Sequence, residues 1–207
     1  MITPDTSLAD LRLMTRGKPI DLALDYLFAQ DHESRVAAVQ KGVDAACNQL
    51  EQHKNKKQKM DEDQITLQIC EMLFAMSFPA FHDASVGGHC DIVITGNEQF
   101  LWLAEAKIHD SYSWLDKGFR QLSTRYSTGV IGQDNGEIII YCYTQNAKVM
   151  LDKWKVELIS RNSGVIIEAS PCGNPLIFLS RHTHDSSGLS FQTRHKAIAL
   201  YWDPKDK

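Results

Sequence analysis

The stretch that decides the fold reads CDIVIT at residues 90–95, GNEQ at residues 96–99 and FLWLAEAKI at residues 100–108. Two segments rich in β-branched and aromatic residues flank a Gly-Asn turn signal, which predicts an antiparallel hairpin. We therefore expect two neighbouring strands whose side chains alternate between the two faces of a sheet.

The register of this hairpin brings acidic side chains together. If the chain turns around Glu98, Asp91 lies opposite Glu105, with Cβ atoms about 5 Å apart on one face of the sheet. Strand alternation places Lys107 on that same face and points Ala106 the other way, into a buried layer. Two carboxylates so placed repel each other unless a cation lies between them. The hairpin therefore predicts a cation site.

The donor atoms indicate which cation this would be. The carboxylates of Asp91 and Glu105, joined by the backbone carbonyl of Ala106, are oxygen ligands that suit Mg²⁺, with Mn²⁺ as a substitute, rather than Zn²⁺. Near His89 no second His or Cys shows zinc-ligand spacing. The ammonium of Lys107 would lie beside the water that attacks a phosphodiester, where it orients this nucleophile or stabilises the developing charge.

A helix predicted over residues 61–76 adds a third acid. At about 100° per residue, Glu62 falls in the middle of the apolar stripe of this helix, whereas Glu71 falls on the opposite side. Glu62 therefore points along the core-facing side of the helix. The alternative is that Glu62 only caps the N-terminus of the helix.

Further segments follow from periodicity and turn signals. The patterns predict short helices within residues 1–31, a long helix over 32–56, a weakly marked strand near 78–85, a loop over 109–116, a helix over 117–126, a strand over 137–144, a helix over 145–161, and strands over 165–169, 176–179 and 197–202. The histidines at 182, 184 and 195 are expected at the surface, in or near a polar loop.

Together these residues resemble the PD-(D/E)XK nuclease superfamily. The match consists of Glu62 in the first core helix, Asp91 on one strand, the Glu105-Ala106-Lys107 triplet on the next, and a following helix. The resemblance implies an α/β protein with a restriction endonuclease-like mixed central sheet flanked by helices, in the order α-β-β-β-α-β. It also implies a helical N-terminal extension over residues 1–60 and a nuclease-like domain over residues 61–207.

The resemblance also implies roles for individual residues. Asp91 and Glu105, with the backbone carbonyl of Ala106, would be metal ligands, Glu62 would bind the metal or a water, and Lys107 would be the catalytic lysine.

The helix after the lysine strand adds a further candidate. Branches similar to the RecB type carry Gln-x-x-x-Tyr in this helix, but here four residues separate Gln121 from Tyr126. We retain Gln121 as a catalytic residue and expect Arg125, one α-helical turn away, to face the same phosphate. Tyr126 is not assigned the family role.

The function implied by the resemblance is a Mg²⁺-dependent endonuclease that hydrolyses phosphodiester bonds of DNA in a prokaryotic defence or repair system. Two alternatives stay open: a non-catalytic nucleic-acid-binding or regulatory module on the nuclease fold, and an RNA-cleaving enzyme, since contact with the 2′-hydroxyl has no short motif. Because a double-strand cut needs two sites, a homo-oligomer or a partner protein is expected. Tyr112 and Trp114 are candidates for stacking on unpaired bases.

Composition limits the other classes of function. The 207 residues carry a formal net charge of −4, which removes the global basicity of many nucleic-acid binders but suits a site rich in acidic ligands. Five widely spaced cysteines predict reduced, buried thiols. The sequence lacks a long apolar window and a secretion signal, so we expect a cytoplasmic protein with no membrane partner. No G-x-S-x-G, Walker or G-x-G-x-x-G motif is present.

Overall fold

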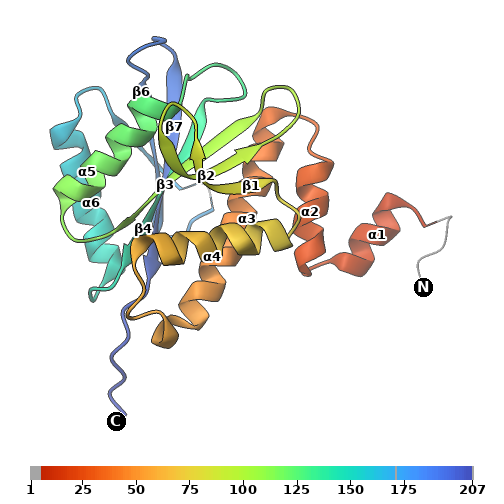
Figure 1. Ribbon diagram of the computed structural model, residues 1–207, viewed down its shortest axis with the longest axis horizontal. Helices are drawn as coiled ribbons and strands as arrows, with labels where there is room; N and C mark the ends of the chain where they lie inside the picture. Colours follow the sequence, from red (N-terminus) through yellow and green to blue (C-terminus); the bar gives the residue numbers. More distant parts are fainter. Residues whose placement is uncertain (1–5, 171, 207) are drawn as a thin grey trace.

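The chain folds around one seven-stranded mixed sheet with the strand order β1-β2-β3-β4-β7-β6-β5 (Figure 1). The computed structural model describes residues 6–170 and 172–206. The strands are β1 (Ala80–Ser85), β2 (His89–Thr95), β3 (Leu101–Ile108), β4 (Asn135–Cys142), β5 (Ile166–Ala169), β6 (Ile177–Thr183) and β7 (Ser190–Ala199). The predicted α/β class with a mixed, helix-flanked sheet is confirmed.

Six α-helices and two shorter helical turns surround the sheet within the described ranges. They are α1 (Leu8–Thr15), α2 (Pro19–Leu27), α3 (His32–Gln52), the 3-10 turn η1 (Lys54–Lys56), α4 (Glu62–Ala75), α5 (Tyr112–Gln121), the π-helix η2 (Leu122–Tyr126) and α6 (Ala147–Arg161). None of the helices in the described parts of the chain is long and apolar enough to cross a membrane.

The pairing of β2 with β3 follows the predicted register from Ile92 to Thr95. Strands β1, β2 and β3 are antiparallel neighbours, and β3, β4 and β7 are parallel neighbours. Across the hairpin, Val93 pairs with Leu103 and Ile92 with Ala104, as a turn at Glu98 predicts. Glu98 adopts a positive φ of 59° in that turn. The hairpin prediction is therefore confirmed.

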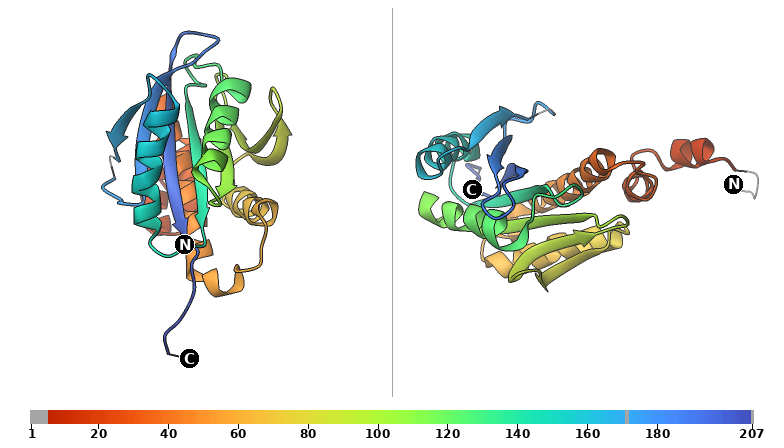
Figure 2. Two further views of the ribbon diagram at one scale, coloured as in Figure 1. Left: turned by 90° about the vertical axis from the view of Figure 1, so that its left-hand side faces the viewer. Right: turned by 90° about the horizontal axis from the view of Figure 1, so that it is seen from above.

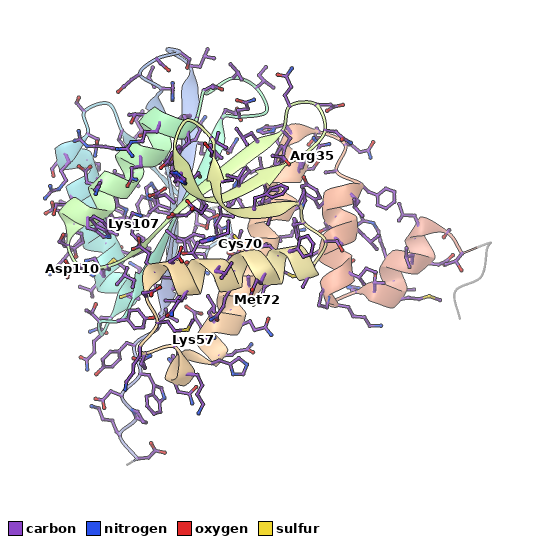
Figure 3. The ribbon with its side chains drawn as sticks, in the orientation of Figure 1. Arg35, Lys57, Cys70, Met72, Lys107 and Asp110 are labelled. Carbon is purple, nitrogen blue, oxygen red and sulfur yellow. The ribbon has the colours of Figure 1, made fainter. Side chains whose placement is uncertain are left out.

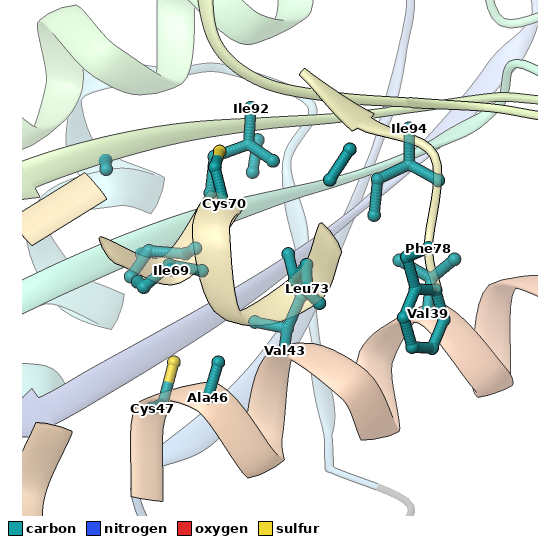
Figure 4. Packing of buried hydrophobic residues seen from close by; sticks show 14 of the residues in the cluster. Val39, Val43, Ala46, Cys47, Ile69, Cys70, Leu73, Phe78, Ile92 and Ile94 are labelled. Atoms are coloured by element: carbon teal, nitrogen blue, oxygen red, sulfur yellow. The ribbon is translucent and has the colours of Figure 1, made fainter. Parts of the chain in front are cut away.

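Helices cover both faces of the sheet (Figure 2). On one face, α3 and α4 pack on the strands through residues such as Val43, Leu73 and Ile92 (Figure 4). On the other face, the apolar side chains of α5, η2 and α6 form a second core with β3, β4 and β6. Ala106 is fully buried on the α3 and α4 side, as alternation predicts. Glu105 and Lys107 therefore face α5.

The N-terminal helices do not all behave alike. The long helix α3 shares one hydrophobic core with α4 and the sheet, from Val36 to Leu50. Helix α1 instead extends away from the sheet beyond α2 (Figures 1 and 2). An ion pair of 2.8 Å between Arg12 and Asp25 joins α1 to α2.

Two segments differ from the sequence predictions. Residues 109–116 do not form a loop throughout, because Ser111 caps α5 by accepting a hydrogen bond from the Trp114 backbone, so that the helix begins at Tyr112. Strand β6 extends into the predicted polar loop as far as Thr183, and β7 begins at Ser190, so that His182 and His195 lie on strands of the sheet. His195 is fully buried, stacks on the Phe178 ring, and burial lowers its pKa to about 3.

The predicted surface position of the histidines is therefore wrong for His195 and also for His184, which is 1% exposed. Polar partners explain how His195 is tolerated in the core: its ring nitrogens lie 2.8 Å from the Ser180 hydroxyl and 3.2 Å from the Trp154 indole nitrogen. The cysteines follow the prediction more closely, since all five are free and all but Cys172 are buried.

Candidate active site

Lys107 lies inside the molecule on β3 (Figure 3). Its side chain is surrounded by a group of acidic residues. Its ammonium nitrogen is 2.9 Å from Glu105 Oε1, 3.1 Å from Glu62 Oε1 and 3.6 Å from Asp91 Oδ2. It also donates a hydrogen bond of 3.0 Å to the carbonyl oxygen of Ala106. We call Glu62, Asp91, Glu105 and Lys107 the carboxylate cluster. The structure thus brings together four of the five residues predicted to be catalytic.

Glu62 reaches this cluster from the first residue of α4. The N-cap of α4 is Asp61, whose side chain accepts from the Gln64 backbone. The alternative that Glu62 only caps the helix is therefore wrong. Instead, Glu62 Oε2 accepts a hydrogen bond of 2.7 Å from the backbone nitrogen of Ile108, at the end of β3. This contact ties α4 to the strand that carries Lys107.

Asp91 is placed by a departure from the regular ladder between β2 and β3. The last pair of aligned residues at this end is Ile92 with Ala104. At the next position, Asp91 Oδ2 accepts a hydrogen bond of 2.7 Å from the backbone nitrogen of Ala106. The Asp91 carboxylate thus takes the place of a backbone acceptor. The expected direct opposition of Asp91 and Glu105 is replaced by a shared contact with Lys107.

The cluster is short of positive charge. It contains three carboxylates and one ammonium group, and Glu105 and Lys107 are both buried. Burial, reinforced by the neighbouring Asp91, raises the pKa of Glu105 to about 7. Burial also raises the pKa of Asp91. Burial alone would lower the pKa of Lys107, but Asp91, Glu105 and Glu62 outweigh it and raise that pKa.

Helix α5 covers the cluster closely at Gly118. A Cβ atom at this position would lie 3.0 Å from Lys107 Cγ and 3.4 Å from Glu105 Cγ. Trp114, one turn earlier, places its indole nitrogen 3.5 Å from Glu62 Oε2. Sequence reasoning missed Gly118, although a glycine inside a predicted helix is a signal for close packing. It also missed the contact of Trp114 with Glu62, because Trp114 was expected in a loop.

Gln121, the fifth predicted catalytic residue, has a different neighbour. It ends α5 and precedes the π-helix η2, whose backbone hydrogen bonds join residues five apart. The Gln121 side chain lies beside the Tyr126 hydroxyl and partly opposes the burial that raises the pKa of Tyr126. That hydroxyl donates a bond of 2.7 Å to the carbonyl oxygen of His89 on β2. Arg125 lies within this π-helix, so a regular α-helical turn does not separate it from Gln121. That both side chains face one phosphate stays a prediction.

The fit of a metal ion to the cluster depends on its donor atoms. Among the described residues, no three or more His, Cys, Asp or Glu side chains are already arranged around a metal position. The Lys107 ammonium lies among the acidic oxygens instead. However, Glu105 Oε2 is buried without a hydrogen-bond partner. An all-oxygen donor set with an unpartnered carboxylate oxygen fits a hard divalent cation.

A second buried charged group lies on the opposite, α3-covered face of the sheet. Arg194 on β7 pairs with Glu137 at 3.0 Å and with Asp44 of α3, which also binds Lys196 at 2.8 Å. We call these four residues the balanced network, because two carboxylates meet two cations. Arg194 and Lys196 are almost completely buried and Glu137 is completely buried.

Comparisons of the chain with protein-family models, with curated proteins and with solved structures found no match. A function must therefore be assigned from the chemistry of the folded chain itself. The carboxylate cluster is the strongest basis for this, because it gathers acids from α4, β2 and β3 around one lysine.

Proposed function

We propose that this chain is a Mg²⁺-dependent nuclease that hydrolyses phosphodiester bonds of DNA on a restriction endonuclease-like fold. The observation that carries the proposal is the convergence of Glu62, Asp91 and Glu105 on Lys107. Burying charges costs desolvation free energy, so a buried group with excess negative charge lowers the stability of the fold unless a cation compensates it. Perturbed carboxylates of this kind are concentrated at functional sites.

The order of the elements supports the same class of protein. From α4 to β4 the chain runs α4, β1, β2, β3, α5, β4, which is the α-β-β-β-α-β order implied by the resemblance. The three acids and the lysine occupy the positions in this order at which the superfamily motif expects them: the first helix, the second strand and the third strand.

The chemistry divides between a metal ion and the residues of the chain. Asp91, Glu105 and Glu62, with the carbonyl oxygen of Ala106, would hold Mg²⁺ or Mn²⁺. When bound, the ion supplies Lewis-acid polarisation of the phosphodiester and compensates its charge. Lys107 is fixed by its strand, and its ammonium can donate to a phosphate oxygen as negative charge develops there.

The test is a cleavage assay with purified protein. Supercoiled plasmid, linear duplex, single-stranded DNA and structured RNA are incubated with Mg²⁺, Mn²⁺ or EDTA. We expect metal-dependent cleavage of DNA that falls by about 10²- to 10³-fold in Lys107→Ala and is also lost in Asp91→Ala. Lys153→Ala, which removes an exposed lysine of α6, is the matched control and should cleave like the unsubstituted protein.

Other outcomes distinguish the alternatives. Cleavage restricted to RNA would support the RNA-cleaving enzyme. Binding of nucleic acid that is never cleaved, and that Lys107→Ala and Asp91→Ala leave unchanged, would support the non-catalytic module. Thermal unfolding of each variant is measured alongside, so that loss of folding is not mistaken for loss of chemistry.

A further inference from the structure

A partly exposed indole lies at the edge of the carboxylate cluster. Trp114 sits in the first turn of α5, which Ser111 caps. The Lys107 ammonium is 5.5 Å from the centroid of the Trp114 ring. Trp102 and Trp154, in contrast, are completely buried in the two cores. Trp114 belongs to neither hydrophobic core, so part of its ring is accessible next to the proposed reaction centre.

A second cation lies over the same ring. The ammonium of Lys117 is 4.5 Å from the Trp114 centroid, one helical turn along α5. Lys117 is exposed, and none of the carboxylates in the described ranges lies within ion-pair distance of it. An exposed lysine over an aromatic ring is held weakly, whereas stacking of a nucleobase on such a ring is stronger. A base can therefore displace the ammonium from the ring.

The charge of the protein favours a local, uncharged contact with a nucleic-acid substrate over general electrostatic attraction. The net charge of −4 gives no general attraction for phosphate groups. The excess carboxylates of the cluster repel phosphate further. Stacking is insensitive to this repulsion, because it uses the face of the base rather than the charge of the backbone.

We propose that Trp114 and Lys117 form a subsite for an unpaired nucleotide. The base stacks on the Trp114 indole in place of the Lys117 ammonium, which then pairs with a flanking phosphate. The inference rests on the proposed nuclease function and deepens it by naming single-stranded DNA as the substrate class. A base inside a duplex already stacks on both neighbours and cannot enter this subsite without leaving the helix.

The first test measures binding without cleavage. Fluorescence anisotropy follows a labelled single-stranded oligodeoxynucleotide, and the blunt duplex of the same sequence, in EDTA. Trp114→Ala should weaken binding of the single strand roughly 5- to 150-fold and leave duplex binding unchanged. Trp114→Phe keeps an aromatic face and should restore most of the affinity. Phe74→Ala removes an exposed aromatic side chain of α4 and is the matched control.

The second test isolates the role of Lys117. Each phosphate that a cation neutralises contributes about 0.7 to the slope of log affinity against log salt for a single strand. Lys117→Ala should therefore reduce that slope by about 0.7. Lys153→Ala, which removes an exposed lysine on a different helix, should leave the slope unchanged.

Several results would overturn the subsite: no single-strand binding by the unsubstituted protein, equal losses on single strand and duplex in Trp114→Ala, or no recovery in Trp114→Phe. These results are distinct from failure of the proposed function. Trp114-dependent binding without metal-dependent cleavage would refute the nuclease and leave a single-strand binding site. Cleavage by a protein whose Trp114 variants bind normally would refute the subsite and leave the nuclease.

Discussion

The carboxylate cluster and the balanced network are both buried charged groups on the same sheet, but their charges differ. The balanced network joins Asp44 and Glu137 to Arg194 and Lys196 beneath α3. The carboxylate cluster sets three acids against Lys107 alone, beneath α5. Each group contains one glutamate whose pKa is raised to about 7, first of all by burial. Desolvation is therefore common to both groups, and the charge ratio is what separates them.

The difference indicates what each group does. In the balanced network every carboxylate has a cationic partner within the chain, so the group needs no bound cation to compensate its charge. In the carboxylate cluster one ammonium is shared by three acids. Glu105 and Glu137 each keep one buried carboxylate oxygen without a hydrogen-bond partner, so this feature is common to both groups and only the charge ratio differs. We infer that the balanced network stabilises the fold, whereas the carboxylate cluster binds a cation for a chemical reaction. Four measurements test this separation.

The largest effect is expected from removing the central cation of the balanced network. At a pH above about 7, where Glu137 is ionised, Arg194→Met leaves this completely buried carboxylate without its partner, and breaking a buried pair in this way costs about 3–5 kcal/mol of unfolding free energy. Urea denaturation measures the loss. The control is Arg181→Met, which breaks an exposed pair with Glu168 and should cost less than about 1 kcal/mol. Similar small losses in both variants would show that the network does not hold the fold.

A divalent cation should stabilise the carboxylate cluster and not the balanced network. At a Mg²⁺ concentration about 100 times the dissociation constant, binding adds about 2.7 kcal/mol, or roughly 5–10 °C in Tm. Thermal unfolding with Mg²⁺ and with EDTA gives this shift. The double variant Asp91→Asn/Glu105→Gln should lose it, whereas Glu137→Gln should keep it. The separation fails if all three proteins shift equally.

The pH dependence of stability should contain a contribution from the balanced network. Burial raises the pKa of Glu137 to about 7 from an ordinary value of 4.5. The folded chain therefore keeps a proton that the unfolded chain has released, and the unfolding free energy falls as pH rises from about 4.5 to about 7. One such group contributes a slope of up to about 1.4 kcal/mol per pH unit.

Glu137→Gln cannot ionise and should remove its share of this slope when unfolding is followed by urea at pH 5, 6 and 7. The share of Glu105, whose pKa is also raised to about 7, should remain. Glu168→Gln replaces a glutamate whose side chain is 36% exposed, and it should leave the profile unchanged. A slope in Glu137→Gln that equals the unsubstituted slope would mean that Glu137 is ionised throughout this range.

The smallest effect is expected at Gly118, where α5 packs against the side chains of Lys107 and Glu105. Alanine is the better helix former by about 1 kcal/mol, but its Cβ atom would lie 3.0 Å from Lys107 Cγ. Overpacking of this kind costs about 1–3 kcal/mol. Gly118→Ala should therefore lose about 1 kcal/mol of stability and several-fold in cleavage rate. A gain in stability would show that the Lys107 side chain can move away from the added Cβ atom without a cost in free energy.

The sequence was most informative where a local pattern and a buried face agree. The hairpin register followed from a Gly-Asn turn and strand alternation, and it brought Glu105 and Lys107 to one face. Glu62 was found because its angle on the helix coincides with the apolar stripe. In each case, short-range geometry was sufficient to position the side chain.

Other features depended on contacts that no short pattern encodes. The start of α5 was missed because a single capping hydrogen bond at Ser111 decides it. His195 was expected at the surface because its partners, Ser180 and Trp154, are distant in the sequence. The second charged group was not recognised at all, since Asp44 lies on α3 and its partners lie on β7.

The π-helix after Gln121 bears on how this chain should be aligned with other sequences. One residue added to an α-helix rotates everything beyond it by about 100°. A π-helical turn takes up the additional residue locally, so β4 and the later elements need not change phase. A search with a fixed motif spacing passes over such a turn.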